Sequence, residues 1–234
     1  MANVLIGYST CQHTREAFAA QGHNVWTCDL RPALEVDYDQ HLQGDIWDFL
    51  LTYKWDFAVL HPMCTYLTVS AAWAYADPDF EKYPGVGYHQ KVKPGTLTGH
   101  ARREAQKAEL ENFRRLLALP FPVAIENPAR SYVCTAIRSP DQCVQPYDYG
   151  DDASKLTGFW LTRGTPKLVA DPALHVKPRW VRGKGGVLPR WANQTDSGQN
   201  RLSPGENRWL KRSATYPGIA AAMGAQWGEW LNNS

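Results

Sequence analysis

A short apolar run that is followed at once by proline and cysteine constrains the fold of this chain more than any other stretch. The run Phe57–Leu60 shows no alternation of polar and apolar residues, a pattern typical of a strand that is covered on both faces in a parallel sheet. Pro62 ends the strand. Because ligands bind beyond the carboxyl ends of the strands in such sheets, we expect His61 to Cys64 to lie at a ligand crevice.

Cys64 has two interpretations at this position. Free cysteine is among the most buried residue types and commonly acts as a small hydrophobe, but a thiol at a strand end is also a candidate nucleophile. A second apolar run, which starts at Phe121 and ends in Glu126-Asn127-Pro128, favours the catalytic interpretation. A carboxyl group with an adjacent amide at a neighbouring strand end suits protonation or hydrogen bonding of a heterocycle.

These two strand ends resemble, in order and in residue type, motifs of the cytosine-C5 DNA methyltransferases, and most closely the short phage-type members. His61-Pro62-Met63-Cys64 resembles the family's Pro-Pro-Cys nucleophile loop, with Met63 in place of the second proline, and Glu126-Asn127-Pro128 resembles its Glu-Asn-Val motif. The resemblance implies that the Cys64 thiol attacks C6 of cytosine in DNA while Glu126 engages N3 and the exocyclic amine. It further implies that C5 then takes a methyl group from S-adenosyl-L-methionine, that Pro62 lines the cofactor site and that Asn127 contacts the substrate.

The start of the chain predicts the cofactor-binding half of a Rossmann-like sheet. A strand over 4–8, a helix over 14–20 that ends at Gly22, and a strand over 23–29 form a β-α-β unit with Asp29 at its end. An acid at this position accepts hydrogen bonds from ribose hydroxyls, so Asp29 is the predicted ribose ligand. The turn Gly7-Tyr8-Ser9 lies beside it, although the family's first loop is Phe-x-Gly-x-Gly; a tight turn without a ligand is the alternative.

Two further segments resemble parts of the family's cofactor site. Gly44-Asp45-Ile46 resembles the Gly-Asp-Ile segment that borders the adenine in related methyltransferases, which assigns Asp45 and Ile46 to that site. Capping of a following helix is the alternative role for Asp45. Residues 213–220 resemble the family's final motif, whose helix packs against the first strand near the cofactor, and this assigns Thr215 to the cofactor site. An amphipathic helix is predicted there by the spacing of Ile219, Met223, Trp227 and Trp230.

The middle of the chain predicts an insertion, a helix and the last strands. Residues 73–99 have no clear period and many turn-forming residues, so we expect a lid or a substrate-contacting insertion. A helix follows from 100 to 119, with a buried stripe of Leu110, Phe113, Leu116 and Leu117, and with its Arg-Arg and Glu-rich remainder facing water. Strands are predicted over 142–147 and 156–161. The segment that contains these two strands lies where the family has its Gln-x-Arg-x-Arg motif, which contacts the flipped base. The arginines of that motif are missing here, and we assign their role to Lys155.

Residues 163–212 are strongly basic. They contain eleven Lys or Arg against three acids, an excess of eight, so a formal net charge of +2 for the whole chain leaves the remainder at about 2 − 8 = −6. Residues 178–204 are rich in Gly, Pro and Trp without a regular period, which predicts an irregular segment. Basic residues interleaved with Trp suit the binding of a polyanion that carries aromatic bases.

The predicted fold class is therefore α/β, a Rossmann-like methyltransferase sheet with helices on both faces. We expect a catalytic core over 1–162 with the insertion 73–99, a basic irregular segment over 163–212, and a C-terminal helix over 213–234 that closes the core. Five cysteines without a C-x-x-C pair indicate neither a disulfide framework nor a metal site, and no apolar run approaches the length of a membrane span. We expect a soluble cytoplasmic protein.

Three functions remain open from the sequence. Methylation of cytosine in DNA fits the motifs around Cys64 and Glu126, with the pKa of the thiol lowered by Thr65, Thr68 and Lys155. Since no separate target-recognition domain is evident, C5 chemistry on single-stranded nucleic acid or on a free pyrimidine nucleotide is an alternative. A phage protein that binds nucleotides or DNA without methyl transfer is the third, supported by Met63 and the first loop. The recognised sequence and the oligomeric state do not follow from the sequence.

Overall fold

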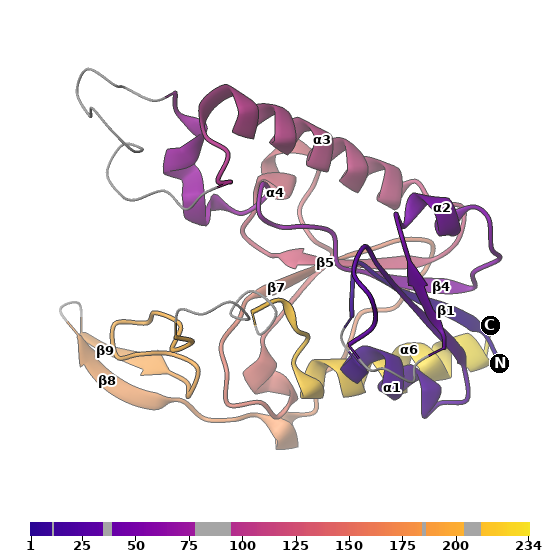
Figure 1. The fold of residues 1–234 in the computed structure, drawn as a ribbon. Coiled ribbons are helices and arrows are strands. Elements are labelled where there is room, and N and C mark those ends of the chain that lie inside the picture. Colours follow the sequence, from indigo (N-terminus) through magenta and orange to yellow (C-terminus); the bar gives the residue numbers. More distant parts are fainter. Residues whose placement is uncertain (11, 35–38, 78–94, 184–185, 204–211) are drawn as a thin grey trace.

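A computed structural model of the chain describes residues 1–10, 12–34, 39–77, 95–183, 186–203 and 212–234 (Figure 1). Its centre is a seven-stranded sheet in the order β3-β2-β1-β4-β5-β7-β6. The strands are β1 (Asn3–Gly7), β2 (Asn24–Asp29), β3 (His41–Gln43), β4 (Phe57–Leu60), β5 (Val123–Pro128), β6 (Gln142–Val144) and β7 (Thr157–Leu161). The first five strands of this order pair in parallel, and β7 is antiparallel to both of its neighbours.

This strand order, with a reversed strand inserted next to one edge, is that of a Rossmann-like methyltransferase sheet, and it confirms the predicted fold class. All four residues of β4 are buried, as expected for a continuous apolar strand in the middle of a two-sided sheet. Gly7 of β1 lies opposite Leu60, and Leu60 lies opposite Ile125 of β5. The carboxyl ends of β1, β4 and β5 therefore meet at one edge of the sheet.

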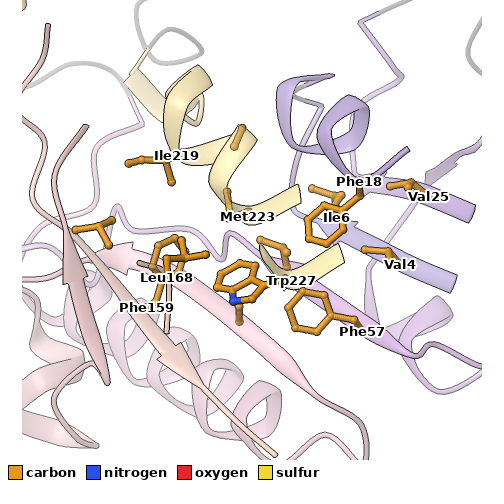
Figure 2. Close-up of a cluster of buried hydrophobic side chains, with 14 of the residues drawn as sticks. Val4, Ile6, Phe18, Val25, Phe57, Phe159, Leu168, Ile219, Met223 and Trp227 are labelled. Atoms are coloured by element: carbon orange, nitrogen blue, oxygen red, sulfur yellow. The ribbon is translucent and has the colours of Figure 1, made fainter. Parts of the chain in front are cut away.

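Helices cover both faces of the sheet, as predicted. The helices α1 (Gln12–Ala19) and α6 (Pro217–Asn232) share one apolar core with Val4, Ile6 and Phe57 (Figure 2). The other core joins Leu5, Ala58 and Leu60 to the helices α2 (Trp47–Leu50), α3 (Gly99–Leu117) and α4 (Tyr132–Ala136). Alternate residues of each strand thus enter opposite cores, which is the period of two of a pleated strand.

The closing helix α6 lies against α1, as the spacing of its apolar residues predicts. Ile219, Met223 and Trp227 are buried, and Trp230 packs at the edge of the same core. Gly224 brings the two helices close, because a Cβ at this position would lie 2.5 Å from the backbone of Ala17. Gly228 likewise lies against Gln21, just after α1, so the two helices run in the same direction and their amino-terminal ends lie at the same end of the pair.

One part of the prediction for α3 is wrong. Phe113 and Leu116 are buried as expected, but Arg102, which was expected to face water, is only 3% exposed. Its guanidinium donates to the carbonyl oxygens of Thr65 at 2.8 Å and Leu97 at 3.4 Å. It also lies 4.7 Å from the ring centroid of Tyr75, at the end of the 3-10 helix η1 (Val69–Tyr75). These partners compensate in part for the burial of the charge, since Nε of Arg102 has no hydrogen-bond partner among the described residues.

The C-terminal basic segment is more regular than predicted. The strands β8 (Arg179–Gly183) and β9 (Gly186–Arg190) pair as an antiparallel two-stranded sheet. The sequence pattern hides this hairpin because each strand is short and contains glycine or proline, which only an edge strand accommodates readily. Trp191 is buried and stacks on Tyr147, in the 3-10 helix η2 (Pro146–Tyr149), with ring centroids 4.1 Å apart. A further 3-10 helix, η3, spans Pro172–Leu174.

Part of the predicted insertion, residues 78–94, lies outside the described residues, as do Cys11 and the segment 204–211. In the described part of the chain, no helix has the length and apolar character needed to cross a bilayer. The same residues contain no cluster of three or more His, Cys, Asp or Glu side chains that suits a metal ion.

Candidate active site

Hydrogen bonds between neighbouring strand ends hold the segment that carries Cys64. The His61 amide donates to Gly7 O at 3.0 Å, and Asn127 Nδ2 donates to Pro62 O at 3.1 Å. Beyond Pro62 the chain turns, and the amides of Leu67 and Thr68 both donate to Cys64 O. Cys64 is itself exposed to solvent. The structure therefore places a thiol at the carboxyl end of β4, fixed from both β1 and β5.

Glu126 lies at the carboxyl end of the adjacent strand β5 and has an unusual charge environment. Its side chain is 14% exposed, and its carboxylate contacts His61 Nδ1 at 3.2 Å and Lys155 Nζ at 3.8 Å. Burial would raise the pKa of Glu126, but Lys155, His61 and a hydrogen bond from Thr157 outweigh it and lower the pKa to about 2. Glu126 is consequently a carboxylate throughout the physiological pH range.

The pKa of Cys64 moves in the direction opposite to our prediction. Partial enclosure of the thiol raises its pKa, and the nearby negative charge of Glu126 raises it further. The charges of Lys155 and Arg212 lower it but do not outweigh those two effects. The expected net lowering of the thiol pKa is therefore wrong for the free protein, because burial and the charge of Glu126 outweigh Lys155, although Lys155 itself acts in the predicted direction.

Two polar atoms in this site have unused hydrogen-bonding capacity. His61 Nε2 and Asn127 Oδ1 are buried and have no partner among the residues that the structure describes. His61 is 10% exposed and Asn127 is 1% exposed. Such groups are uncommon in folded proteins, and each calls for a water molecule or a ligand as a partner.

The turn after β1 has the predicted place at the sheet edge but a tighter structure than a glycine-rich loop. Tyr8 has a positive φ of 58°, and the amide of Ser9 donates to Cys28 O at 3.0 Å. Gly7 is required by packing, because a Cβ there would lie 2.2 Å from the Ile46 side chain. The Tyr8 side chain turns toward α3, where its hydroxyl bonds Asn112, and burial raises its pKa to about 12.

Asp29 ends β2 next to this turn, as predicted. It is 9% exposed, and its Oδ1 accepts hydrogen bonds from the amide and Nε of Arg31, both at 3.0 Å. Oδ2 makes only a longer contact of 3.4 Å with Arg31 Nη2. The arginine side chain is about half exposed, so a ribose hydroxyl that approaches Oδ2 would compete with a solvent-accessible guanidinium.

Asp45 and Ile46 follow β3 and differ in their surroundings. Asp45 is exposed and its Oδ1 accepts from the Trp47 amide at 3.0 Å, the capping role that was the alternative for this residue. Ile46 is buried against Gly7 and Leu60, in the apolar core. The Gly44 amide donates to Asp29 O, so this segment lies directly beside the end of β2.

Thr215 precedes α6, at the end of that helix nearest the start of α1. No contact joins it to Asp29 or Asp45 among the described residues, so its assignment to the cofactor site stays a prediction. Its neighbourhood nevertheless borders the candidate site, since the charge of Arg212 acts on Cys64. Gly218, at the start of α6, donates to Asp151 Oδ2 at 2.9 Å, and this contact fixes the helix next to the segment that precedes Lys155.

Sequence reasoning missed three residues that shape the site. His61 lies inside the motif that resembles the nucleophile loop, but no role was predicted for its side chain. Thr157 follows Lys155 closely and helps to lower the pKa of Glu126, and its hydroxyl donates to Lys155 O at 3.2 Å. Asn112 bonds both Tyr8 and the Trp47 indole, the latter at 2.8 Å. The signal for His61 was available in its place directly after β4, whereas Thr157 and Asn112 depend on tertiary contacts that a single sequence does not display.

No protein-family model matches the chain, and no curated protein matches it. Thirty-two chains of solved structures do match. One is a crystal structure that is provisionally described as a DNA modification methyltransferase encoded within a prophage of E. coli. It is 13% identical, with a TM-score of 0.39, and the match covers 69% of this chain and 46% of that chain. The chain thus spans less than half the length of that protein. The methyltransferase-like fold itself rests on the order and direction of the strands described above.

Proposed function

We propose that this protein transfers a methyl group from S-adenosyl-L-methionine to C5 of cytosine in DNA, with Cys64 as the nucleophile. The observation that carries the proposal is the pair of groups at adjacent strand ends, the partly enclosed thiol of Cys64 and the carboxylate of Glu126, which contacts His61 and Lys155. In a methyltransferase-like fold, a structural role would not require either group at the ligand-binding edge.

The chemistry starts from the thiolate. Its sulfur forms a bond to C6, and the electron pair of the C5–C6 double bond moves toward C5 and the ring carbonyl, which makes C5 a nucleophile. C5 would then take the methyl group as the carbon–sulfur bond of the donor breaks and the demethylated donor leaves. C5 loses its proton to water, and the C5–C6 double bond re-forms as N3 returns its proton to Glu126 and the Cys64 thiolate leaves. The enzyme's thiol is thereby restored, and the net change on the base is the exchange of one hydrogen for a methyl group.

The charge of Glu126 defines its role in this scheme. As a carboxylate it accepts a hydrogen bond from the exocyclic amine of cytosine, and it would take up the proton that the Cys64 thiol loses and pass it to N3 as the sulfur adds. Lys155 and His61 hold it in place. An exocyclic amine that donates a hydrogen bond to Glu126 would offset part of the negative charge that raises the pKa of Cys64, so substrate binding itself would favour the thiolate.

The residues at the ends of β1 to β3 fit an adenosine group in placement and donor type. Asp29 offers Oδ2 to ribose hydroxyls, and the Gly7–Ser9 turn and Asp45 follow the strands on either side of β2; Pro62 follows β4, on the other side of β1. S-adenosyl-L-methionine, when bound, supplies the methyl group and a positive charge near the thiol. Ile46 supports this region from the core side rather than from solvent.

A trapping experiment tests the proposal. Oligonucleotides that carry 5-fluorocytosine have no C5 proton to lose, so we expect the protein to accumulate as a covalent adduct that needs both Cys64 and the methyl donor. Cys64→Ala is expected to form no adduct. Glu126→Gln is expected to retain binding and to lose a factor of about 10² to 10⁴ in rate. Methyl transfer by Cys64→Ala, or turnover of wild-type protein without adduct on any pyrimidine substrate, refutes the mechanism.

A second candidate is a nucleotide- or DNA-binding protein that does not transfer methyl groups. The raised pKa of Cys64 in the free protein favours it, because a thiol is a poor nucleophile at neutral pH. Incubation of the protein and labelled S-adenosyl-L-methionine with duplex DNA, with single strands and with dCMP distinguishes the two candidate functions. Label in any of these products supports transfer and identifies the substrate, whereas binding without label supports the second candidate.

A further inference from the structure

A basic surface cavity lies between the β8–β9 hairpin and Asp152 and has no part in the chemistry above. Its volume is about 520 Å³, and it is lined by Lys177, Arg179, Arg190 and Arg201, with Asp152 as the one acid in the lining. Arg179 and Arg190 face each other across the β8–β9 hairpin, where they are paired in register. The four cations come from three separate stretches of the chain, so the fold has gathered them.

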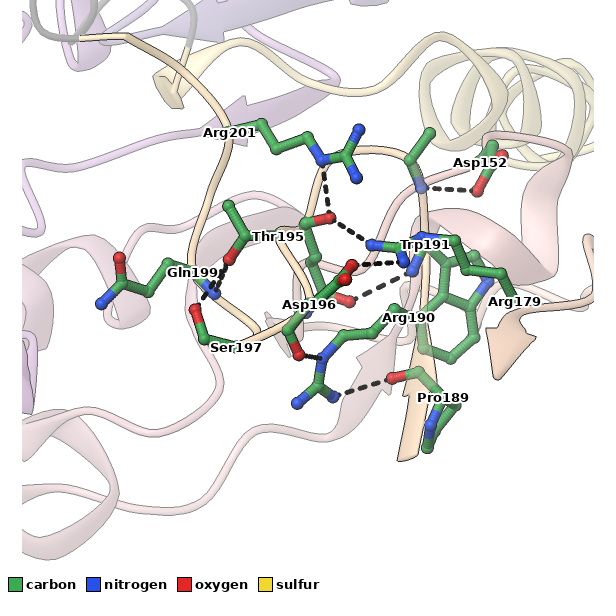
Figure 3. A network of polar contacts seen from close by, with 12 residues as sticks. Asp152, Arg179, Pro189, Arg190, Trp191, Thr195, Asp196, Ser197, Gln199 and Arg201 are labelled. Atoms are coloured by element: carbon green, nitrogen blue, oxygen red, sulfur yellow. Dashed lines mark hydrogen bonds and ion pairs between the residues drawn. The ribbon is translucent and has the colours of Figure 1, made fainter. Parts of the chain in front are cut away.

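Backbone carbonyl groups hold the three arginines in place. Arg201 Nε and Arg179 Nη2 both donate to Gln194 O at 2.8 Å, and Arg190 Nε donates to Asp196 O at 3.1 Å (Figure 3). Figure 3 shows the three side chains converging on the loop from Trp191 to Arg201. Carbonyl oxygens orient a guanidinium without neutralising it. These side chains are therefore already ordered before a ligand binds, so that binding costs less conformational entropy.

The charge of the cavity is only partly compensated. Asp196 contacts Arg179 Nη1 at 2.6 Å and is itself 71% exposed. Lys177 has no partner in the part of the chain that the structure describes. With Asp152 and Asp196 counted against four cations, an excess of 4 − 2 = 2 positive charges remains. Planar, pre-oriented guanidinium groups are suited to phosphate oxygens.

The cavity is close to the candidate site along the chain. Asp152, in its lining, accepts a hydrogen bond from the Ala192 amide at 2.8 Å, and Asn193 bonds the backbone of Ser154 in both directions at 3.0 Å. Lys155 follows, with its ammonium facing Glu126. Three residues span at most about 11 Å, so the backbone of Asp152, in the cavity lining, lies within about that distance of the backbone of Lys155, which contacts Glu126.

We propose that this cavity binds a backbone phosphate of a nucleic-acid strand, next to the nucleotide whose base lies at Cys64. The inference rests on the proposed function for the identity of that base. A free nucleotide carries its phosphate on the sugar of the reacting base itself, whereas this cavity is separated from Glu126 by the segment 152–155. Trp180, in the adjacent hairpin, is 66% exposed and offers a face on which a neighbouring base can stack.

Binding measured against salt tests the inference without any need for methyl transfer. Lys177→Gln and Arg201→Gln together remove two cations of the cavity and leave Arg179 and Arg190 in the hairpin. For a fluorescent single strand, we expect weaker binding and a slope of log affinity against log salt that is shallower by about 1.4, the value for two phosphate contacts. A matched pair, Lys54→Gln with Lys167→Gln, removes two exposed cations outside the cavity, and we expect it to leave the slope unchanged.

A variant that is expected to bind more tightly distinguishes the loss of a phosphate contact from the loss of the folded structure. Asp196→Asn removes the carboxylate that competes for Arg179, so we expect tighter binding of the same strand. Equal slopes for the cavity pair and the matched pair, or no gain from Asp196→Asn, overturn the inference. So does an equal loss of affinity for dCMP and for the strand in the cavity pair, since the cavity would then hold the phosphate of a mononucleotide. If binding follows these expectations and the fluorinated strand gives no adduct, the proposed function fails and the phosphate site stands.

Discussion

Glu126 and Lys155 act on the Cys64 thiol in opposite directions. The carboxylate raises the pKa of the thiol and the ammonium lowers it, although the two groups are themselves an ion pair with an oxygen-to-nitrogen distance of 3.8 Å. The reactivity of Cys64 in the free protein is thus a balance of local charges and burial. Substitution of either partner shifts that balance in a known direction.

Alkylation of Cys64 measures this balance. Glu126→Gln removes a negative charge, so we expect iodoacetamide to modify Cys64 faster at about pH 7.5, by up to about tenfold for each pKa unit gained. Lys155→Met removes a positive charge and is expected to slow the same reaction. Mass spectrometry of the Cys64 peptide separates this thiol from the exposed Cys143. Shifts of the same sign in both variants would contradict the charge assignment.

Glu126 also links stability to pH. Its pKa in the folded protein is about 2, below the roughly 4.3 of an unfolded chain, so its contribution is fully present above about pH 4.3 and is lost as the pH falls toward 2. The shift corresponds to a stability contribution on the order of 3 kcal/mol. Urea unfolding at several pH values is expected to show that Glu126→Gln has a flatter acid limb than the wild type. Parallel limbs would show that the carboxylate is not held by His61 and Lys155.

At the level of elements, the sequence predicted those features that depend on local pattern. The run Phe57–Leu60 matched β4, and the closing helix was found from its apolar spacing. The β8–β9 hairpin and the burial of Arg102 were not found. Pairing of two short strands that contain glycine and proline, and the carbonyl partners of one arginine, are set by approach of distant segments and leave no periodic signal.

The candidate site also has some features that local sequence pattern predicts and others that only tertiary contacts determine. The strand-end positions of Cys64 and Glu126 follow from apolar runs that stop at polar residues. The hydrogen bonds of Arg31 to Asp29, the packing of Ile46 on Gly7 and the raised pKa of the thiol all depend on side chains that meet only in the folded chain. These tertiary contacts determine how the predicted residues behave, and a single sequence does not contain them in readable form.

Arg102 in α3 anchors the segment that carries Cys64, because its guanidinium donates a hydrogen bond to Thr65 O. We therefore expect its substitution to affect both stability and trapping. Arg102→Met leaves Thr65 O without its donor, so we expect a loss of about 1–3 kcal/mol in the free energy of unfolding. We also expect slower trapping on 5-fluorocytosine, because Thr65 directly follows Cys64. Lys107→Met, on an exposed face of the same helix, is the control and is expected to change stability by less than about 0.5 kcal/mol. A variant at Arg102 as stable as this control would exclude the anchoring role.

Across the whole molecule, the basic and the acidic parts of the chain belong to different parts of the fold. The residues from 163 to 212 carry an excess of eight positive charges, while the rest of the chain is acidic by about six. The hairpin in that basic segment is one of the elements that follow β7, whereas the acid that ends β2 belongs to the other half of the sheet (Figure 1). This separation agrees with the two ligand sites proposed above, one for an adenosine group at the ends of β1 to β3 and one for a phosphate next to the β8–β9 hairpin.

Ligand-induced stabilisation tests the adenosine half of that division. If the turn after β1 and Asp29 hold S-adenosyl-L-methionine or its demethylated product, ligand at about 100 times its dissociation constant stabilises the fold by about 2.7 kcal/mol. For a chain of this length, that corresponds to a rise of about 5–10 °C in Tm. Asp29→Ala is expected to abolish most of the rise, and Asp39→Ala, an exposed acid before β3, is expected to keep it. Because Arg31 occupies the Asp29 carboxylate in the free protein, Arg31→Ala is expected to increase the rise by removing the competitor. The absence of any rise at millimolar ligand, with all three variants alike, would show that this sheet edge does not bind the cofactor.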